Sequence, residues 1–165
     1  MIFDSHAHYD SHQFDEDRFD VLSSMPESNV SGIVNCGCDI PSSEMSLSFA
    51  DKYPYVYASV GFHPGCVEDY KDGDLERIKE LSMHKKCVAI GEIGLDYHYE
   101  KESRENQLIL LEKQIQLANE LDLPIIFHDR ESHEDTLNIL KKYRPKGVLH
   151  CFSGSVEMAK EIIKL

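Results

Sequence analysis

Five side chains that commonly bind metal ions stand just after short apolar runs of the sequence. They are His6, His8, Glu92, His128 and His150, in the segments IFDSHAH, VAIGEIGLD, PIIFHDR and GVLHCFSG. Short apolar runs bounded by turn residues predict buried β-strands. In a β/α barrel the functional residues collect at the carboxyl ends of the strands. The pattern therefore predicts one metal centre at the mouth of such a barrel.

The first part of this centre is a pair of histidines on one strand. His6 and His8 are two residues apart, so both side chains leave the same face and can bind one ion. A carboxylate between two ions can bridge them, which is the role that we expect for Glu92. Gly91 and Gly94 beside it would let the backbone pack closely.

The second part consists of His128 and His150, which each end an apolar run and could complete a second ion site. A single histidine in such a place would more often be structural. Five such residues at equivalent strand ends favour a site for two divalent ions. Imidazole ligands suit zinc, manganese or nickel, whereas carboxylate and water positions suit magnesium or manganese.

Several neighbouring residues are candidates for substrate contacts. His63, in VGFHPG, could contact substrate or act as a catalytic acid, and a role in the His-Pro-Gly turn is the alternative. Arg130 suits a phosphate or carboxylate through its fork of donors, and a salt bridge to Asp129 or Glu131 is the alternative. Three more residues adjoin the expected strand ends and would line the pocket: Asp96, Tyr97 and Ser153.

Strands and helices are expected to alternate along the whole chain. The strand candidates are Ile2–His8, Gly32–Gly37, Val56–Phe62, Val88–Ile93, Ile125–His128 and Val148–Phe152. The helix candidates are Asp15–Pro26, Ser42–Tyr53, Asp74–Lys85, Ser103–Leu121, Ser132–Tyr143 and Val156–Leu165. This alternation implies a parallel sheet, either open or closed into a barrel. A barrel is favoured, because the ends of the first, fourth, fifth and sixth strands would lie far apart on a flat sheet.

Length and charge narrow the class of protein. The 165 residues predict one domain over 1–165. Five cysteines without a signal-peptide pattern suggest reduced thiols and a cytoplasmic location, and no run is apolar enough for a membrane span. With a formal charge of −13, the protein surface as a whole attracts nucleic acid poorly. Bound metal ions would therefore have to attract a phosphate substrate.

The motifs DSHAHYD, GFHP, GEIGLDY, PIIFHDRES and HCFSGS resemble, in order and spacing, those of the TatD family of metal-dependent deoxyribonucleases. The resemblance implies an amidohydrolase-like TIM (β/α)8 barrel with a pair of divalent ions at its mouth. It makes His6 and His8 ligands of the first ion, Glu92 a bridging and catalytic residue, and His128 and His150 ligands of the second. It also places His63 near the substrate phosphate. Gly65 stands where the family often has a second histidine, which leaves one substrate contact in doubt.

The C-terminal part of the expected barrel departs from the family pattern. A complete barrel has eight strands, and this chain supplies the first six β/α units. By the resemblance, the last strand would carry an aspartate that ligates the first ion, so the chain is expected to be a fragment or a truncated product with reduced activity. The first and sixth strands would then be open edges, which favours self-association.

The leading functional hypothesis is hydrolysis of DNA phosphodiester bonds, at strand ends or on single strands, with two metal ions that clamp the phosphate. Two alternatives stay open. One is hydrolysis of a small amide, ester or lactone, as in the wider amidohydrolase superfamily. The other is a truncated product that binds metal or a partner chain without turnover.

Overall fold

A computed structural model describes residues 1–99 and 103–165. Strands and helices alternate, as predicted. The strands are β1 (Ile2–Ala7), β2 (Val30–Cys36), β3 (Val56–Val60), β4 (Cys87–Asp96), β5 (Ile125–Arg130) and β6 (Gly147–Leu149). The α-helices are α1 (Arg18–Ser24), α2 (Ile40–Lys52), α3 (Asp74–Ser82), α4 (Arg104–Glu120), α5 (His133–Tyr143) and α6 (Val156–Ile162). Two 3-10 helices, η1 (His12–Phe14) and η2 (Pro64–Asp69), lie in the loops after β1 and β3.

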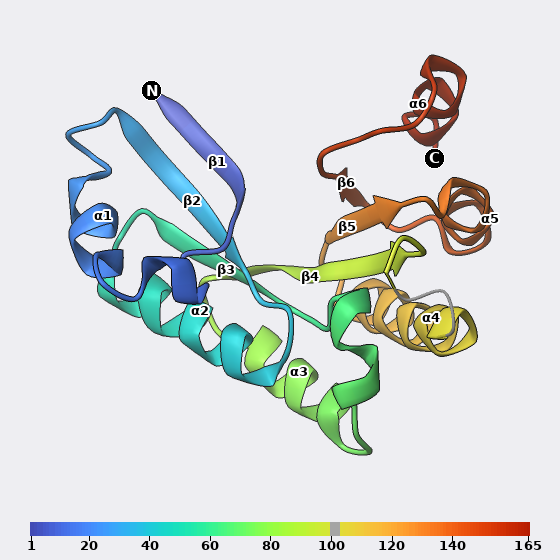
Figure 1. Cartoon of the computed structure of the whole chain (residues 1–165), viewed down its shortest axis with the longest axis horizontal. Helices are drawn as coiled ribbons and strands as arrows, with labels where there is room; N and C mark the ends of the chain where they lie inside the picture. Colours follow the sequence, from blue (N-terminus) through green and yellow to red (C-terminus); the bar gives the residue numbers. More distant parts are fainter. Residues whose placement is uncertain (100–102) are drawn as a thin grey trace.

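The strands form one parallel sheet in the order β1-β2-β3-β4-β5-β6. The sheet curls strongly, with helices α2 to α5 on its convex side and β1 and β6 at its two edges (Figure 1). This is the architecture of the first six units of a β/α barrel, so the prediction of an incomplete barrel is confirmed.

The main core lies between the convex face of the sheet and the helices. Helix α4 shows why, because Leu111, Ile115 and Ala118 recur at helical spacing and are all buried against the sheet. A second, smaller cluster of buried residues packs on the other face of the sheet: Val34, Cys36, Ala89 and Ile126. These small side chains support the base of the concave side, on which the strand ends converge.

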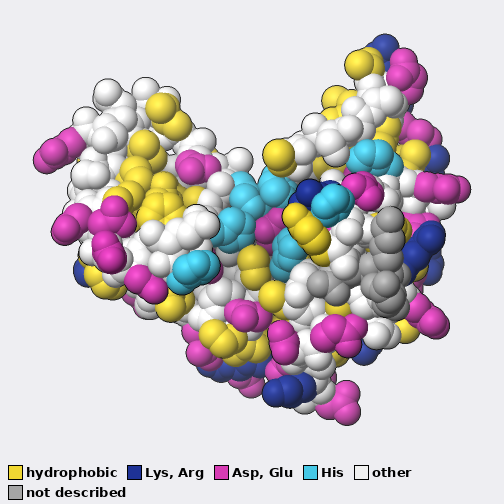
Figure 2. Space-filling view, viewed as in Figure 1, with side chains coloured by type: hydrophobic (Ala, Val, Ile, Leu, Met, Phe, Trp, Pro, Cys, Tyr) yellow, Lys and Arg dark blue, Asp and Glu magenta, His cyan; other side chains and the backbone are white. Residues whose placement is uncertain are grey.

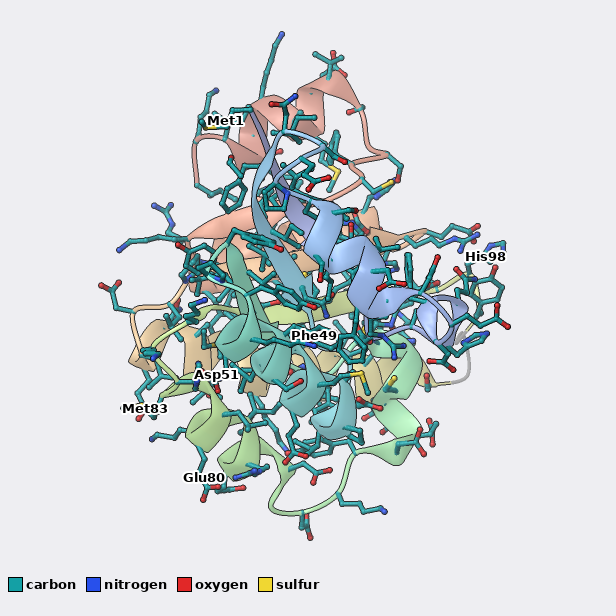
Figure 3. The ribbon with its side chains drawn as sticks, turned by 90° about the vertical axis from the view of Figure 1, so that its left-hand side faces the viewer. Met1, Phe49, Asp51, Glu80, Met83 and His98 are labelled. Atoms are coloured by element: carbon teal, nitrogen blue, oxygen red, sulfur yellow. The ribbon has the colours of Figure 1, made fainter. Side chains whose placement is uncertain are left out.

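The strand directions set which side of the molecule carries the mouth. Figure 3 shows Asp51, near the end of α2, and Met83, which follows α3, on the side opposite His98. Because the helices run antiparallel to the strands, the side with His98 is the side of the carboxyl strand ends. None of the helices in the described ranges has the length and apolarity that crossing a membrane requires.

Two strand ends differ from the prediction by three residues, and the other strand boundaries differ by at most two. Strand β6 ends at Leu149, not at Phe152, because Cys151 adopts a left-handed backbone conformation (φ 47°) that an extended strand cannot contain. Strand β4 continues past Ile93 to Asp96, because its pairing with β5 extends to the partners Asp96 and Arg130.

Candidate metal centre

The carboxyl ends of β1, β4 and β5, together with the loop that follows β6, meet in the hollow of the curled sheet. Figure 2 shows histidine side chains gathered at the base of this hollow, with acidic atoms between them. All five residues predicted as metal ligands lie here. The curl of the sheet brings them together from positions as far apart in the sequence as His6 and His150.

Glu92, near the middle of β4, is the residue on which the histidines converge. It is only 2% exposed. Its Oε2 atom lies 3.3 Å from Nε2 of His6 and 3.1 Å from Nε2 of His8. Its Oε1 atom lies 3.0 Å from Nδ1 of His128 and 2.6 Å from Nε2 of His150. Each carboxylate oxygen therefore faces a different pair of imidazoles.

Two glycines allow this close packing, as the sequence suggested. A Cβ on Gly91 would lie 2.8 Å from the Cβ of Ile126, and a Cβ on Gly94 would lie 2.0 Å from the carbonyl oxygen of His128. Gly94 also has a φ of +152°, which side chains rarely allow. The backbone of β4 can thus approach β5 closely on both sides of Glu92.

The charge state of Glu92 follows from this environment. Burial alone would raise the pKa of its carboxyl, but hydrogen bonds from His128, His150, His6 and His8 hold that pKa well below its ordinary value. The carboxylate is therefore ionised at any physiological pH. A buried negative charge among imidazoles is a donor set that fits divalent transition ions.

The atoms that could share an ion fall into two groups with Glu92 in common. One consists of His6, His8 and Glu92, and the other of His63, Glu92 and His128. Within each group the donor atoms lie within 4.8 Å of one another. His150 belongs to neither group, although it contacts Glu92 and its ring stacks on that of His6 at 3.8 Å between centroids.

His63 is better suited to hydrogen bonding than to holding an ion. Its Nδ1 atom accepts a hydrogen bond from the backbone N–H of Gly65 at 2.9 Å, at the start of η2. Burial lowers the pKa of His63 to about 4, so the ring is neutral near pH 7. A neutral ring that accepts at Nδ1 carries its proton on Nε2, which lies 3.8 Å from Oε1 of Glu92. The hydrogen bond to Gly65 gives His63 the role in the turn that was the alternative, and its role as a substrate contact or catalytic acid stays a prediction.

Two thiols at and just beyond the end of β2 contact the histidines at and just beyond the end of β1, which the sequence did not lead us to expect. Sγ of Cys36 lies 3.6 Å from Nδ1 of His6, and Sγ of Cys38 lies 3.8 Å from Nδ1 of His8. The thiols stay protonated, because burial raises the pKa of Cys36 to about 12 and that of Cys38 further. The hydrogen bond with Glu92 raises the pKa of His8, against the effect of burial. The matching two-residue spacing of C-x-C and H-x-H was the available signal.

Asp96 holds His128 from the side opposite Glu92. Its Oδ2 atom lies 3.1 Å from Nε2 of His128, while Nδ1 of the same ring faces Glu92. Burial lowers the pKa of His128, but the two carboxylates raise it above its ordinary value. Asp96 was expected on a loop lining the pocket, and it lies instead at the end of β4, where it is 5% exposed.

The three predicted substrate contacts lie in different surroundings. Arg130 ends β5 and is exposed, with its guanidinium carbon 4.7 Å from the ring centroid of Tyr99. Ser153 is exposed in the loop after β6. Tyr97 is not brought to the hollow: it is 9% exposed, and its hydroxyl donates to Asp135 at 2.6 Å. Successive strand residues alternate in direction, so Asp96 facing inward turns Tyr97 towards α5.

Comparison with known proteins was consistent with this centre. The family model described as TatD related DNase matches residues 3–165. The uncharacterized metal-dependent hydrolase YabD of Bacillus subtilis is 42% identical over 100% of this chain and 66% of its own length. The 3'-5' ssDNA/RNA exonuclease TatD of Erwinia tasmaniensis is 35% identical over 93% of this chain and 61% of its own. The crystal structure of the TatD homologue YjjV from Escherichia coli superimposes with a TM-score of 0.91 at 33% identity, covering 99% of this chain and 64% of that one. The chain thus spans slightly less than two thirds of the length of these relatives.

Proposed function

This chain belongs to the TatD-related DNase family, and from that membership and the geometry of the centre we propose that it is a metal-dependent hydrolase of DNA phosphodiester bonds. The observation that carries the proposal is the buried Glu92 carboxylate, whose two oxygens face separate pairs of imidazoles. A buried carboxylate among imidazoles is a donor set that fits divalent ions, which is what a metal-dependent hydrolase needs.

The proposed ligand assignment divides the centre into two ion sites. His6 and His8 would hold the first ion, His128 and His150 the second, and Glu92 would bridge the two. His150 is preferred to His63 for the second ion, because the hydrogen bond from Gly65 occupies Nδ1 of His63 and leaves a proton on Nε2. Zinc, manganese and magnesium are the candidate ions.

The reaction would combine the ions with groups of the chain itself. Divalent ions in these sites would supply charge stabilisation to a phosphodiester and lower the pKa of water. His63 would donate a hydrogen bond from Nε2 to a phosphate oxygen, because its ring is neutral and its proton points into the hollow. Arg130 would donate to another phosphate oxygen through its planar fork. Asp96 would keep the ring of His128 in place.

The proposed substrate is a single strand or a strand end. A hollow whose donor atoms lie at its base admits a flexible terminal nucleotide more easily than the middle of a duplex. Relatives named 3'-5' ssDNA/RNA exonuclease support this choice. Because the overall charge is −13, affinity for DNA would come from local contacts at the centre and not from a general basic surface.

The test is hydrolysis of end-labelled single-stranded DNA by the purified chain loaded with manganese or zinc. We expect shortening of the strand that EDTA abolishes and that Glu92→Gln abolishes. Hydrolysis of a cyclic amide or lactone without cleavage of DNA would favour the amidohydrolase alternative. Metal binding with neither reaction would mean that the chain acts as a binding protein.

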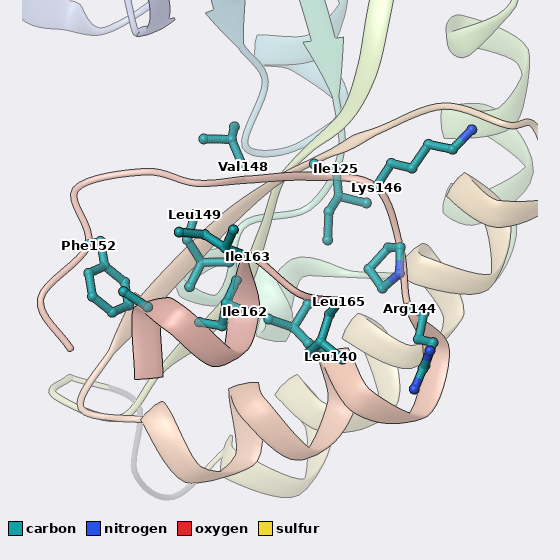
Figure 4. A pocket seen from close by; sticks show the side chains of 13 residues that line it. Ile125, Leu140, Arg144, Lys146, Val148, Leu149, Phe152, Ile162, Ile163 and Leu165 are labelled. Atoms are coloured by element: carbon teal, nitrogen blue, oxygen red, sulfur yellow. The ribbon is translucent and has the colours of Figure 1, made fainter. Parts of the chain in front are cut away.

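The open edges of the sheet suggest a second copy of the chain as a partner. Ile2 and Phe3 on β1 are 56% and 58% exposed. Beside β6, an apolar cavity of about 610 Å³ lies between the strand, α5 and α6, and Val148, Leu149 and Phe152 line it (Figure 4). We propose that these edges mediate self-association in the cytoplasm, and a fall in sedimentation coefficient on dilution would be the sign of it.

A further inference from the structure

An exposed tyrosine and an exposed arginine form a pair on the rim of the hollow. The guanidinium carbon of Arg130 lies 4.7 Å from the ring centroid of Tyr99, and Tyr99 is 67% exposed. The ring of His98 meets that of Tyr99 edge-on, with 4.4 Å between centroids. An aromatic residue this exposed contributes little to the core, so its place near the centre calls for another explanation.

The backbone of β5 places Arg130 on the same face of the sheet as His128, and Tyr99 contacts Arg130. Arg130 lies two residues beyond His128 on β5, so the two side chains leave the same face of the sheet. Strand geometry separates their Cα atoms by roughly 6.6 Å along the direction of the mouth. The backbone oxygen of Arg130 also accepts a hydrogen bond from the N–H of Tyr97 at 2.9 Å, which ties the start of the Tyr99 loop to β5. In Figure 2, Lys or Arg atoms border the histidines of the hollow.

Three described acids near Arg130, namely Asp129, Glu131 and Asp96, are engaged with other partners. Asp129 pairs with Nδ1 of His133 at 2.6 Å, and Glu131 pairs with Nδ1 of His98 at 2.7 Å. Asp96 is bonded to His128. Among residues 1–99 and 103–165, Arg130 forms no ion pair, so the salt bridge considered from the sequence is absent there. A guanidinium that pairs with no carboxylate of these described residues is available for an external anion, even in a protein of charge −13.

This combination of groups matches the chemistry of single-stranded nucleic acid. One face of the Tyr99 ring meets the guanidinium, and the exposed remainder of the ring offers an apolar surface for a flat base. Base stacking on an aromatic side chain, next to a cation that binds the backbone, is the usual way in which proteins hold single strands. A phosphate alone would need the arginine but not the tyrosine.

We propose that Tyr99 and Arg130 form a nucleotide subsite beside the metal centre, in which Tyr99 stacks on a base of a single strand and Arg130 binds the adjoining phosphate. This inference rests on the proposed nuclease function and extends it to the contacts that hold the strand. The subsite is tolerant of sequence, because every base has a face that can stack.

The test compares two short, fluorescent, phosphorothioate-linked strands, one of thymidine units and one of abasic units, binding to the metal-loaded chain. Tyr99→Ala should weaken binding of the thymidine strand by about 5- to 100-fold and leave the abasic strand unchanged. Tyr99→Trp should restore the affinity. Arg130→Gln should weaken the binding of both strands, because it removes the phosphate contact that the two strands share. A uridine strand shows whether the subsite accepts RNA as well as DNA.

A matched control exists elsewhere on the surface. Phe19 on α1 is 50% exposed and has the Nζ atom of Lys52 at 4.0 Å from its ring centroid. Phe19→Ala removes an exposed ring beside a cation without touching the hollow, and it should leave both affinities unchanged.

The outcomes separate the subsite from the nuclease proposal. Equal affinities of the wild type for the two strands, or a Tyr99→Ala variant that binds as the wild type does, would overturn the subsite even if DNA is hydrolysed. Base-dependent binding that requires Tyr99, without hydrolysis of an ordinary phosphodiester strand, would keep the subsite and overturn the nuclease proposal.

Discussion

Replacing Glu92 by glutamine is the sharpest test of the proposed centre. Glutamine has the same shape and keeps one oxygen, but it carries no charge. In the wild type both carboxylate oxygens face imidazole nitrogens, at distances from 2.6 Å to 3.3 Å. The substitution therefore removes the one charge that the two proposed ion sites share and changes little of the packing.

The size of the effect can be worked from the electrostatics. Two unit charges about 4 Å apart attract by about 4 kcal/mol at the effective dielectric constant of ~20 that suits protein sites. A factor of ten in affinity corresponds to about 1.4 kcal/mol. Loss of the Glu92 charge should accordingly weaken metal binding by about 10³-fold, and more if both charges of a divalent ion sense it fully.

The measurement is a calorimetric titration of metal-free protein with manganese or zinc near pH 7.5. A suitable control is Glu44→Gln, because Glu44 is exposed and its one ion pair within the described part of the chain is with Arg77, at 2.8 Å. Far-ultraviolet circular dichroism establishes that each variant is folded. A folded Glu92→Gln variant whose metal affinity stays within about threefold of the wild type would refute the idea that this carboxylate joins the two sites.

Three further predictions concern the groups around Glu92. Without metal, the raised pKa values of His8 and His128 give stability that is complete below pH 6.5 and is lost as the pH rises through the folded-state values. The melting temperature in EDTA should therefore fall as the pH is raised above 6.5. Added metal should reverse this slope, because it binds the deprotonated rings; an unchanged slope would contradict the assignment. Asp96→Asn should weaken metal binding by about 10- to 100-fold in calorimetry, as expected for a residue that orients a ligand. An unchanged metal affinity would mean that Asp96 has no role in the centre. Gly94→Ala should lower the free energy of unfolding, measured in urea, by at least about 3 kcal/mol or prevent folding. The control is Gly73→Ala, because Gly73 also has a positive φ but a Cβ there would meet no atom within 4 Å, so the loss should be only about 1 kcal/mol. Equal losses would mean that the contact of Gly94 with β5 is unimportant.

The architecture was predictable because two signals in the sequence agree. Apolar runs alternate with helical periodicity, which predicts a parallel sheet, and the candidate ligands stand at the ends of runs one, four, five and six. Only a curled sheet brings those ends together, as His6 stacked on His150 shows. The end of β6 was less predictable, because the left-handed conformation of Cys151 depends on the loop that carries His150 to Glu92 and not on local propensity.

The surroundings of the ligands were harder to predict than the ligands. From the sequence, Cys36 and Cys38 were expected only to be reduced thiols, yet they contact the imidazoles of His6 and His8. These contacts depend on a β1–β2 register that contains irregularities. Tyr97 was placed in the pocket although strand alternation turns it away. That error came from ending β4 at Ile93, since a strand continued to Asp96 fixes the direction of both residues.

The sequential order of the strands has a consequence for how the protein matures during synthesis. Each strand pairs with the one made just before it, so the sheet can grow by one unit at a time as the chain leaves the ribosome. Translation proceeds at ~5–20 residues per second, so roughly 3–12 s separate the appearance of Glu92 from that of His150. The ring of His150 reaches Glu92 only from the loop after β6. In the proposed assignment, loading of the second ion would therefore follow docking of β6, so metal uptake would report when this strand and its loop are in place.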